Sequence, residues 1–243
     1  MKTNFTRMAG LALVAVALMS SCTSENLCLK GNEGIQTREI KLSTIDGIDM
    51  QIAGNVQIHQ GPQAIKVTGH SNVINQLSED VNGEFWAVKF KDGCYKNYEL
   101  NIDITVPDLS KVILSGSGDI EIGDFNNQEG LDVLIAGSGN IYLNSFNNAT
   151  SLNSAINGSG NILFNKDFSV PHHNVSIYGS GEYKAYKVSS KNAKVTLSGS
   201  GNCFLNVNSF LDVKLHGSGN VHYRGTPKVN FSIDGSGQVI MEQ

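Results

Sequence analysis

The stretch VTLSGSGNCFL, residues 195–205, places a glycine–serine–glycine triplet between two short segments in which apolar and polar residues alternate. Such alternation is typical of β-strands, because successive side chains of a strand point to opposite faces. The triplet therefore separates two strands. Four interpretations compete for it: a phosphate-binding loop, a calcium-binding loop, a site for a reactive thiol at Cys203, or a structural corner.

The triplet occurs seven times between residues 116 and 237, at spacings of 18 to 21 residues. Every copy has the same alternating phase before and after it. A unit of this length cannot bury its own apolar face, whereas stacked copies can. Glycine at a corner permits positive φ and close approach of one coil to the next. The predicted structural corner glycines are Gly116, Gly118, Gly137, Gly139, Gly158, Gly160, Gly179, Gly181, Gly199, Gly201, Gly217, Gly219, Gly235 and Gly237.

This repeat predicts an all-β protein, a right-handed parallel β-helix over residues 111–243 with coils of 18–21 residues. An antiparallel barrel or sandwich, with each triplet as a hairpin turn, is the alternative. It is disfavoured because hairpins need no fixed phase between successive turns. The polar stretches between units have room for a third short strand, and the residues after each triplet predict an outward ladder of mostly amide side chains. The last triplet lies so near the end that the final coil is expected to be short and partly uncapped.

Residues 38–110 predict an irregular β region that caps the solenoid and continues into it as one domain. Alternating strands are expected at 48–61, 64–69, 84–90 and 98–107, with a helical turn within 71–80. A single glycine, Gly54, stands where later units carry the full triplet.

The first residues have the composition of an export signal. Lys2 and Arg7 precede an apolar run at residues 8–19, which is shorter than the roughly 20 residues that a membrane-spanning helix requires. Small residues then stand directly before Cys22, a pattern that resembles bacterial lipoprotein signal peptides. The resemblance implies a signal peptide at 1–21, acylation of Cys22 and attachment to the cell envelope, on the periplasmic or surface face of the outer membrane. A flexible tether is expected at 22–37.

The other three cysteines divide into a core residue and a pair. Cys203 lies in the column of Ile120, Ile141 and Ile162, which predicts a small buried hydrophobe and not a reactive thiol. An exported compartment permits disulfides. We hypothesise that Cys28 and Cys94 form a disulfide that ties the N-terminal segment to the cap.

Charge and motif spacing argue against several chemistries. The net charge of −4 includes no basic stripe for nucleic acid. No triplet is followed by lysine or opens a helix, as phosphate loops require. Calcium-binding solenoids repeat every nine residues with regular aspartates, whereas Asp119 is the one aspartate that follows a triplet here. We therefore expect no cofactor.

Candidates for metal or acid–base chemistry are similarly sparse. His216 and His222 flank one corner without an evident third ligand, and the histidines are expected to be surface residues. Glycosidases need paired carboxylates, and Asp132, Asp212 and Asp234 are predicted to be isolated outward positions. The sequence predicts no catalytic site and no metal site.

A solenoid offers long flat faces for recognition. The aromatic candidates for contact with a glycan or a protein are Tyr142, Tyr178, Tyr183 and Tyr223, with Tyr186 in the same region. Self-association through the C-terminal coil is the expected route for a structural role in assembly.

The opening REIKLSTIDGIDMQIAGNVQIHQG, residues 38–61, and the seven triplet rows together resemble the bacterial family called putative auto-transporter adhesin, head GIN domain. The resemblance covers most of the chain after the export signal. It implies a parallel β-helix, an origin among lipoproteins of the Bacteroidetes type, and a non-catalytic adhesin-like function at the envelope. A structural envelope protein and a polysaccharide-cleaving enzyme are the alternatives.

Overall fold

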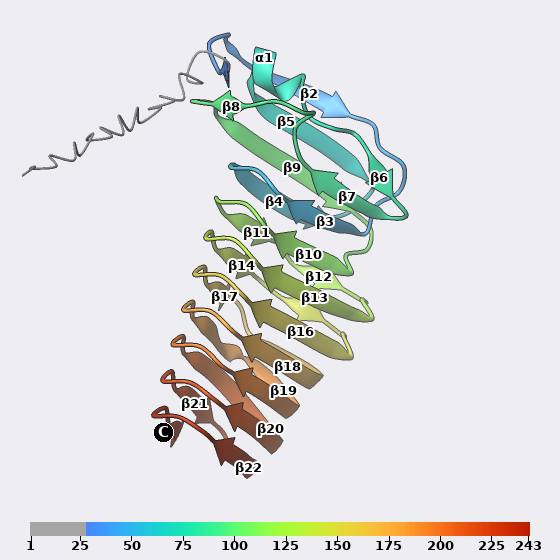
Figure 1. Ribbon diagram of the computed structural model, residues 1–243. Coiled ribbons are helices and arrows are strands. Elements are labelled where there is room, and N and C mark those ends of the chain that lie inside the picture. The colour runs from blue at the N-terminus through green and yellow to red at the C-terminus, as the bar shows by residue number, and fades with distance from the viewer. Residues whose placement is uncertain (1–27) are drawn as a thin grey trace, which may run out of the picture.

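The computed structural model describes residues 28–243, which form a parallel β-solenoid of about 6 turns with a cap at its N-terminal end (Figure 1). This is the architecture that the triplet repeat predicts. The predicted signal peptide at 1–21, the lipidation of Cys22 and the first part of the predicted tether lie outside the described residues. In the described part of the chain, no helix is long and apolar enough to cross a membrane.

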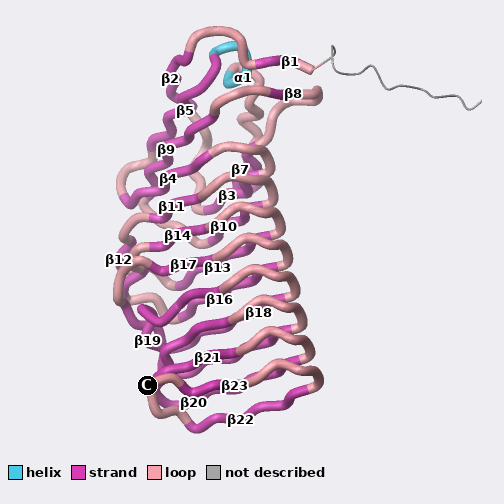
Figure 2. Tube along the Cα trace, turned by 90° about the vertical axis from the view of Figure 1, so that its left-hand side faces the viewer, coloured by secondary structure: helices cyan, strands magenta, loops and turns pink. Residues whose placement is uncertain are grey.

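Each complete coil has three sides (Figure 2). The first side precedes the glycine corner and contains β3 (Gly47–Met50), β10 (Lys111–Leu114), β13 (Gly130–Ile135), β16 (Ser151–Ile156), the later parts of β18 (Phe168–Ile177), β19 (Tyr183–Leu197) and β20 (Cys203–Leu215), and β22 (Lys228–Ile233). The second side follows the corner and contains β4 (Asn55–Gln60), β11 (Ile120–Ile122), β14 (Ile141–Leu143), β17 (Ile162–Phe164), the first parts of β19 and β20, β21 (Val221–Arg224) and β23 (Val239–Met241). The third side includes β12 (Phe125–Asn126) and β15 (Phe146–Asn147), where a third strand is expected. On each side, strands of neighbouring coils pair in parallel, as β10 does with β13, β11 with β14 and β12 with β15.

The core consists of columns of inward-facing side chains. Ile120 pairs with Ile141, which pairs with Ile162, and each is fully buried. The same column continues through Tyr183 to Cys203, which is a buried free cysteine, as its position in the repeat predicts. Burial of each aliphatic side chain contributes about 1.5–3 kcal/mol.

The glycine corners stack so closely that a side chain has no space there. A Cβ atom placed on Gly139 would lie 1.6 Å from the carbonyl oxygen of Gly118, and one on Gly160 would lie 1.8 Å from the oxygen of Gly139. Main-chain hydrogen bonds hold the corners together, such as the one that the Ser138 N–H donates to the Gly116 carbonyl at 3.3 Å. The triplets are therefore structural corners.

The residue after each triplet forms an amide ladder along the stack. The Asn161 side chain donates to the Asn140 oxygen at 2.9 Å, and Asn140 donates in the same way to Asp119 at 3.0 Å. These side chains are half-buried, so they are less exposed to solvent than the sequence predicts. Their main-chain N–H groups donate to the same oxygens, so the ladder fixes the corner as well as covering it.

The cap covers the N-terminal end of the solenoid. Antiparallel strands β2 (Ile35–Ile40), β5 (Ala64–His70) and β9 (Leu100–Val106) extend the second side beyond β4. Beside β3 lies β7 (Phe85–Val88), with β6 (Val81–Asn82) antiparallel to it. Trp86 of β7 is fully buried in the cap, where its indole N–H donates to the Ser78 carbonyl at 3.1 Å. Helix α1 (Ser71–Ile74) falls where a helical turn is expected.

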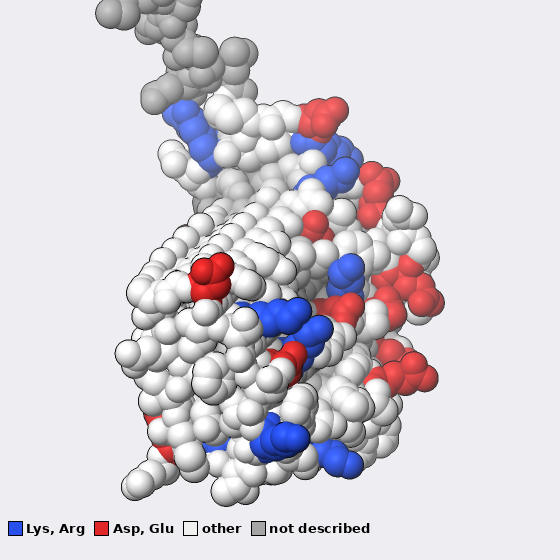
Figure 3. Space-filling view, turned by 60° about the horizontal axis from the view of Figure 1, so that its bottom comes forward, with Lys and Arg blue, Asp and Glu red and all other residues white. Residues whose placement is uncertain are grey.

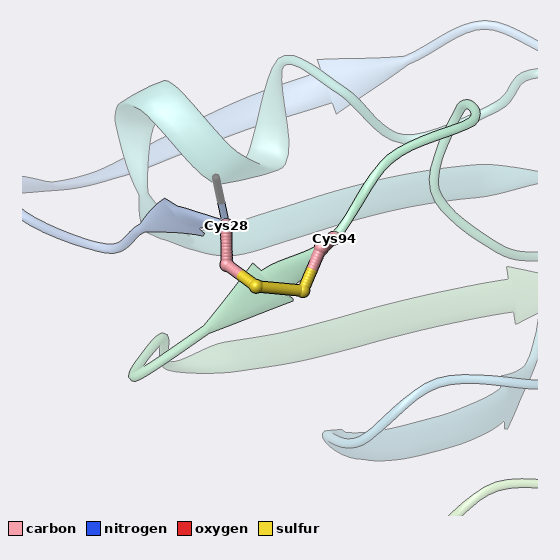
Figure 4. Close-up of a disulfide and its surroundings, with 2 residues drawn as sticks. All are labelled: Cys28 and Cys94. Atoms are coloured by element: carbon pink, nitrogen blue, oxygen red, sulfur yellow. A yellow bond between two sulfur atoms is a disulfide. The ribbon is translucent and has the colours of Figure 1, made fainter. Parts of the chain in front are cut away.

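A disulfide joins Cys28 to Cys94, the pair that the cysteine analysis selects (Figure 4). Beside it, β1 (Leu29–Lys30) pairs in parallel with β8 (Tyr95–Lys96). The prediction of a flexible tether is therefore wrong for residues 28–37, because this part of the chain forms β1 and the start of β2. Sequence alone missed β1 because a strand of two residues has too little alternation to be recognised, and it placed the start of β2 three residues too late.

The glycine corners generate a stability prediction. Gly139→Ala places a methyl group against the Gly118 carbonyl, so we expect it to lower the free energy of unfolding by about 3 kcal/mol or more. Gly34→Ala is the matched control, because a Cβ there meets nothing within 4 Å. Urea unfolding followed by circular dichroism measures both. Equal midpoints for the two variants would contradict the steric role of the corner.

Candidate binding face

The second side of the solenoid presents a continuous row of outward side chains, and we call this surface the lateral face. Strand register places one residue of each coil in the row. From the cap to the C-terminal end its members are Asp103, Gln57, Glu121, Tyr142, Leu163, Lys184, Phe204, His222 and Ile240. The row thus changes from acidic and amide residues near the cap to mostly aromatic and apolar ones, with Lys184 among them, toward the C-terminal end.

The aromatic half of the lateral face contains a groove of about 360 Å³. Phe164, Leu163, Tyr186 and Phe204 supply its apolar surface, and the lysines at 184 and 187 and Asn165 supply its polar groups. Ligand sites commonly combine a mostly apolar hollow with a few placed polar groups. This groove therefore has the composition of a binding site.

Hydrogen bonds and ring contacts hold the groove's aromatic side chains in place. The Tyr186 hydroxyl donates to Glu242 at 2.5 Å, and the Arg224 guanidinium lies 4.0 Å from the centre of the Tyr186 ring. His222 stacks on Phe204 with 4.8 Å between ring centres, and its Nδ1 lies 2.8 Å from the Glu242 carboxylate. These contacts pre-organise the aromatic rings before any ligand binds.

The same contacts set the protonation of this cluster. Burial, and then the hydrogen bond to Glu242, raise the pKa of the Tyr186 hydroxyl well above its usual value. The hydrogen bond from Tyr186 lowers the pKa of Glu242. The cluster therefore holds a neutral phenol beside an ionised carboxylate at neutral pH, which suits hydrogen bonding and does not suit a phenolate base.

The half of the lateral face nearer the cap is polar. One hollow of about 330 Å³ is lined by Asn55, Gln57, Asn101, Asp103, Asp119 and Glu121, with Val56 and Ile102. A second of about 210 Å³ lies beside it and includes His59, Tyr142 and Asn144. Despite these carboxylates, the described residues contain no group of three or more His, Cys, Asp or Glu side chains placed to bind a metal ion.

The structure separates the predicted tyrosines. Tyr142 lies on the lateral face, and Tyr178 is 57% exposed but sits at a glycine corner, away from the groove. Tyr223 faces inward and packs against the core. The prediction of Tyr183 as a surface contact is wrong, because its side chain is fully buried.

Sequence reasoning missed Phe204 as a groove residue. Its signal was available: Phe204 directly follows the inward Cys203, so alternation directs a large apolar side chain outward. Glu242 carried no such signal, since it lies beyond the last strand and reaches Tyr186 across 56 residues of sequence. That contact depends on how the coils stack.

A polar cluster lies inside the solenoid. His173 is fully buried, and its Nε2 lies 2.6 Å from the Tyr183 hydroxyl, which also contacts the Ser154 hydroxyl at 3.0 Å. The other ring nitrogen of His173 is buried without a hydrogen-bond partner. The expectation that all histidines are surface residues is therefore wrong for His173. Burial lowers its pKa to about 3.

The buried histidine predicts a loss of stability in acid. The unfolded chain binds a proton at His173 below about pH 6.5 and the folded protein does so only near pH 3, so folding loses up to about 1.4 kcal/mol per pH unit between these values. We expect His173→Gln to flatten the pH dependence of urea unfolding between pH 4 and 7. The adjacent exposed His172→Gln is the control. An unchanged slope in His173→Gln would contradict this assignment.

The fold defines a class of protein, a parallel β-solenoid with an antiparallel cap. The chain belongs to the family described as putative auto-transporter adhesin, head GIN domain, whose family model matches residues 44–227. None of the curated proteins compared with the chain matches it.

Solved structures share this fold. A putative adhesin from Bacteroides fragilis is similar with 21% identity and a TM-score of 0.77, over 88% of this chain and 100% of that one. A putative lipid binding protein from Parabacteroides distasonis is similar with 24% identity and a TM-score of 0.71, over 88% of this chain and 99% of that one. At these identities the likeness concerns the fold alone.

Proposed function

We propose that this protein is a non-catalytic, adhesin-like binding protein of the cell envelope that holds glycan chains on its lateral face. The aromatic groove carries the proposal. Phe204 and Tyr186 offer apolar ring surface against which the C–H faces of a sugar pack, while Lys184 and Asn165 lie beside them to bond hydroxyl groups. Because the groove lies on an open, flat side of the sheet, it can bind the interior of an extended glycan chain and does not need a free chain end.

Membership of the adhesin family supports a function in attachment. The sequence around Cys22 supports a lipid anchor, because small residues precede the cysteine after a short apolar run. A single acyl chain binds membranes only marginally, so stable attachment needs more than one. The anchor would keep the solenoid at the envelope surface, where its lateral face meets carbohydrate.

Polysaccharide cleavage is the second candidate, because Glu242 and Arg224 approach to 3.8 Å beside the groove. A lyase needs a base with access to its substrate. Tyr186 is unsuited to that task, because burial and the Glu242 hydrogen bond raise its pKa. Glu242 is itself engaged by Tyr186 and His222. These contacts favour binding without cleavage.

The proposed function predicts saturable glycan binding by the chain that lacks residues 1–22. Phe204→Ala removes ring surface from the groove, so we expect about a tenfold weaker affinity, which corresponds to ~1.4 kcal/mol. The exposed Tyr178→Ala at a corner is the matched control and should bind as the wild type does. A glycan array followed by calorimetry provides the measurement, with thermal unfolding to verify that both variants fold.

Two results would count against this function. Equal affinity of Phe204→Ala and Tyr178→Ala would remove the groove from the binding site. Cleaved glycans detected by mass spectrometry in the same samples would replace the binding function with an enzymatic one.

The lipid anchor has its own test. We expect Cys22→Ser to abolish incorporation of an alkyne-tagged fatty acid and to move the protein from the membrane fraction to the soluble fraction, because the acylated thiol is lost. Ser21→Ala keeps a small residue before the cysteine and should retain both the label and the membrane fraction. If Cys22→Ser still incorporates the tagged fatty acid, Cys22 is not the lipidated residue and the proposed anchor is wrong.

A further inference from the structure

The C-terminal end of the solenoid has an open strand edge. On one side β22 pairs with β20, and in the described part of the chain no strand pairs with its other side. Phe231 and Ile233 lie below the buried Val213 and Leu215 of the preceding coil, yet they are 58% and 41% exposed. Figure 3 shows this end of the molecule, where several charged side chains stand among a larger uncharged surface.

The main chain of β22 has hydrogen-bonding groups directed at this open edge. The Asp234 N–H donates to the Leu215 carbonyl at 2.7 Å, so by the alternation of parallel strands the even-numbered residues face β20. Val229, Phe231 and Ile233 therefore direct their N–H and C=O groups away from the molecule. The same three residues carry the apolar side chains that continue the core columns.

We propose that this edge is a dimerisation surface, on which a second copy of the chain pairs its own β22 antiparallel and joins the two solenoids end to end. Exposed apolar strand edges act as templates for another strand. The occupant is a second copy because β22 is complementary to itself.

The self-complementarity fixes a register centred on Phe231. A two-fold axis there places Phe231 against Phe231 of the second copy and Val229 against its Ile233, so all three residues exchange hydrogen bonds. It also keeps the apolar side chains of both copies on the same side, so the two cores become continuous. Lys228 then lies opposite the second copy's Asp234, twice by symmetry.

Other registers lose this charge match. Shifts of one pairing step in either direction place Lys228 opposite Ser232 or Ser236. The Asp234 side chain is 90% exposed, with a distant contact of 3.9 Å to His216, so it remains accessible to a lysine across the edge. Opposite charges directly across an antiparallel pair stabilise it, and like charges destabilise it.

The opposite end of the molecule finishes in an antiparallel edge strand, β2, which pairs only with β5 in the described part of the chain. It does not repeat the apolar, parallel edge of β22, which disfavours head-to-tail stacking. Antiparallel β2 and β5 and helix α1 cover that end (Figure 1). Glu39 of β2 is exposed there, and the half-buried Arg38 is paired with Glu79. Pairing between two C-terminal ends is therefore closed and stops at a dimer.

The dimer would place the two caps, with their Cys28–Cys94 disulfides, at its far ends. In combination with the proposed anchor at Cys22, two copies held by opposing membranes would be joined through their C-terminal coils. This consequence rests on the proposed function, whereas the dimer itself does not.

Charge exchange tests the register directly. We expect the chain that lacks residues 1–22 to dimerise in sedimentation velocity runs over roughly 1–100 µM, and Lys228→Asp or Asp234→Lys alone to weaken the dimer about tenfold or more. The double variant should restore it, and a mixture of the two single variants should form heterodimers. Lys214→Asp, on the same outward side one coil earlier, is the control and should dimerise as the wild type does.

Three results would overturn the proposal. They are a monomer throughout the concentration range, single variants that dimerise as the wild type does, or a double variant that is not restored. Thermal unfolding of each variant separates weakened pairing from lost folding. Glycan binding on the lateral face is measured separately in the same variants, so its loss or retention does not decide the dimer.

Discussion

The contact between a glycine and the carbonyl of the glycine one coil above is the constraint on which this structure depends. Strands of a sheet lie about 4.8 Å apart, and a corner can follow that spacing only where no Cβ intervenes. At Gly139 the missing Cβ would stand 1.6 Å from the Gly118 oxygen. The repeated triplet is thus the condition for stacking, and the amide ladder beside it secures the same corner.

Repetition of this corner creates the lateral face. Because each coil begins its second side at the same place, outward residues from distant parts of the sequence fall into one row, from Asp103 near the cap to His222 near the C-terminal end. The corners are filled by main-chain packing, so the outward rows are the surfaces whose side chains are free to differ between coils. The side chains of the row differ from coil to coil, whereas the backbone conformation repeats. The same scaffold therefore presents a polar half and an aromatic half on its lateral face.

Much of this fold can be predicted from the sequence, because alternation and the triplets act locally. The buried Cys203, the helical turn and the pairing of Cys28 with Cys94 followed from position and cell compartment. Tyr183 stands in the same column as Cys203, so periodicity indicated its burial, and its residue type led to the wrong prediction. The contacts of Glu242 lie beyond the last strand and depend on how the coils stack, which no local pattern reports. His173 stands in regular register between the buried Leu152 and Ala193, so the repeat indicated its burial as well, and its residue type led to the wrong expectation.

The central claim is that the corners are scaffold and the lateral face is the site. Hydrogen–deuterium exchange of the chain that lacks residues 1–22, with and without a bound glycan, tests it most directly. The account predicts added protection in residues 183–187, 203–206 and 221–224, and unchanged exchange at the glycine triplets. Protection confined to the triplets, with none in those three segments, would contradict it.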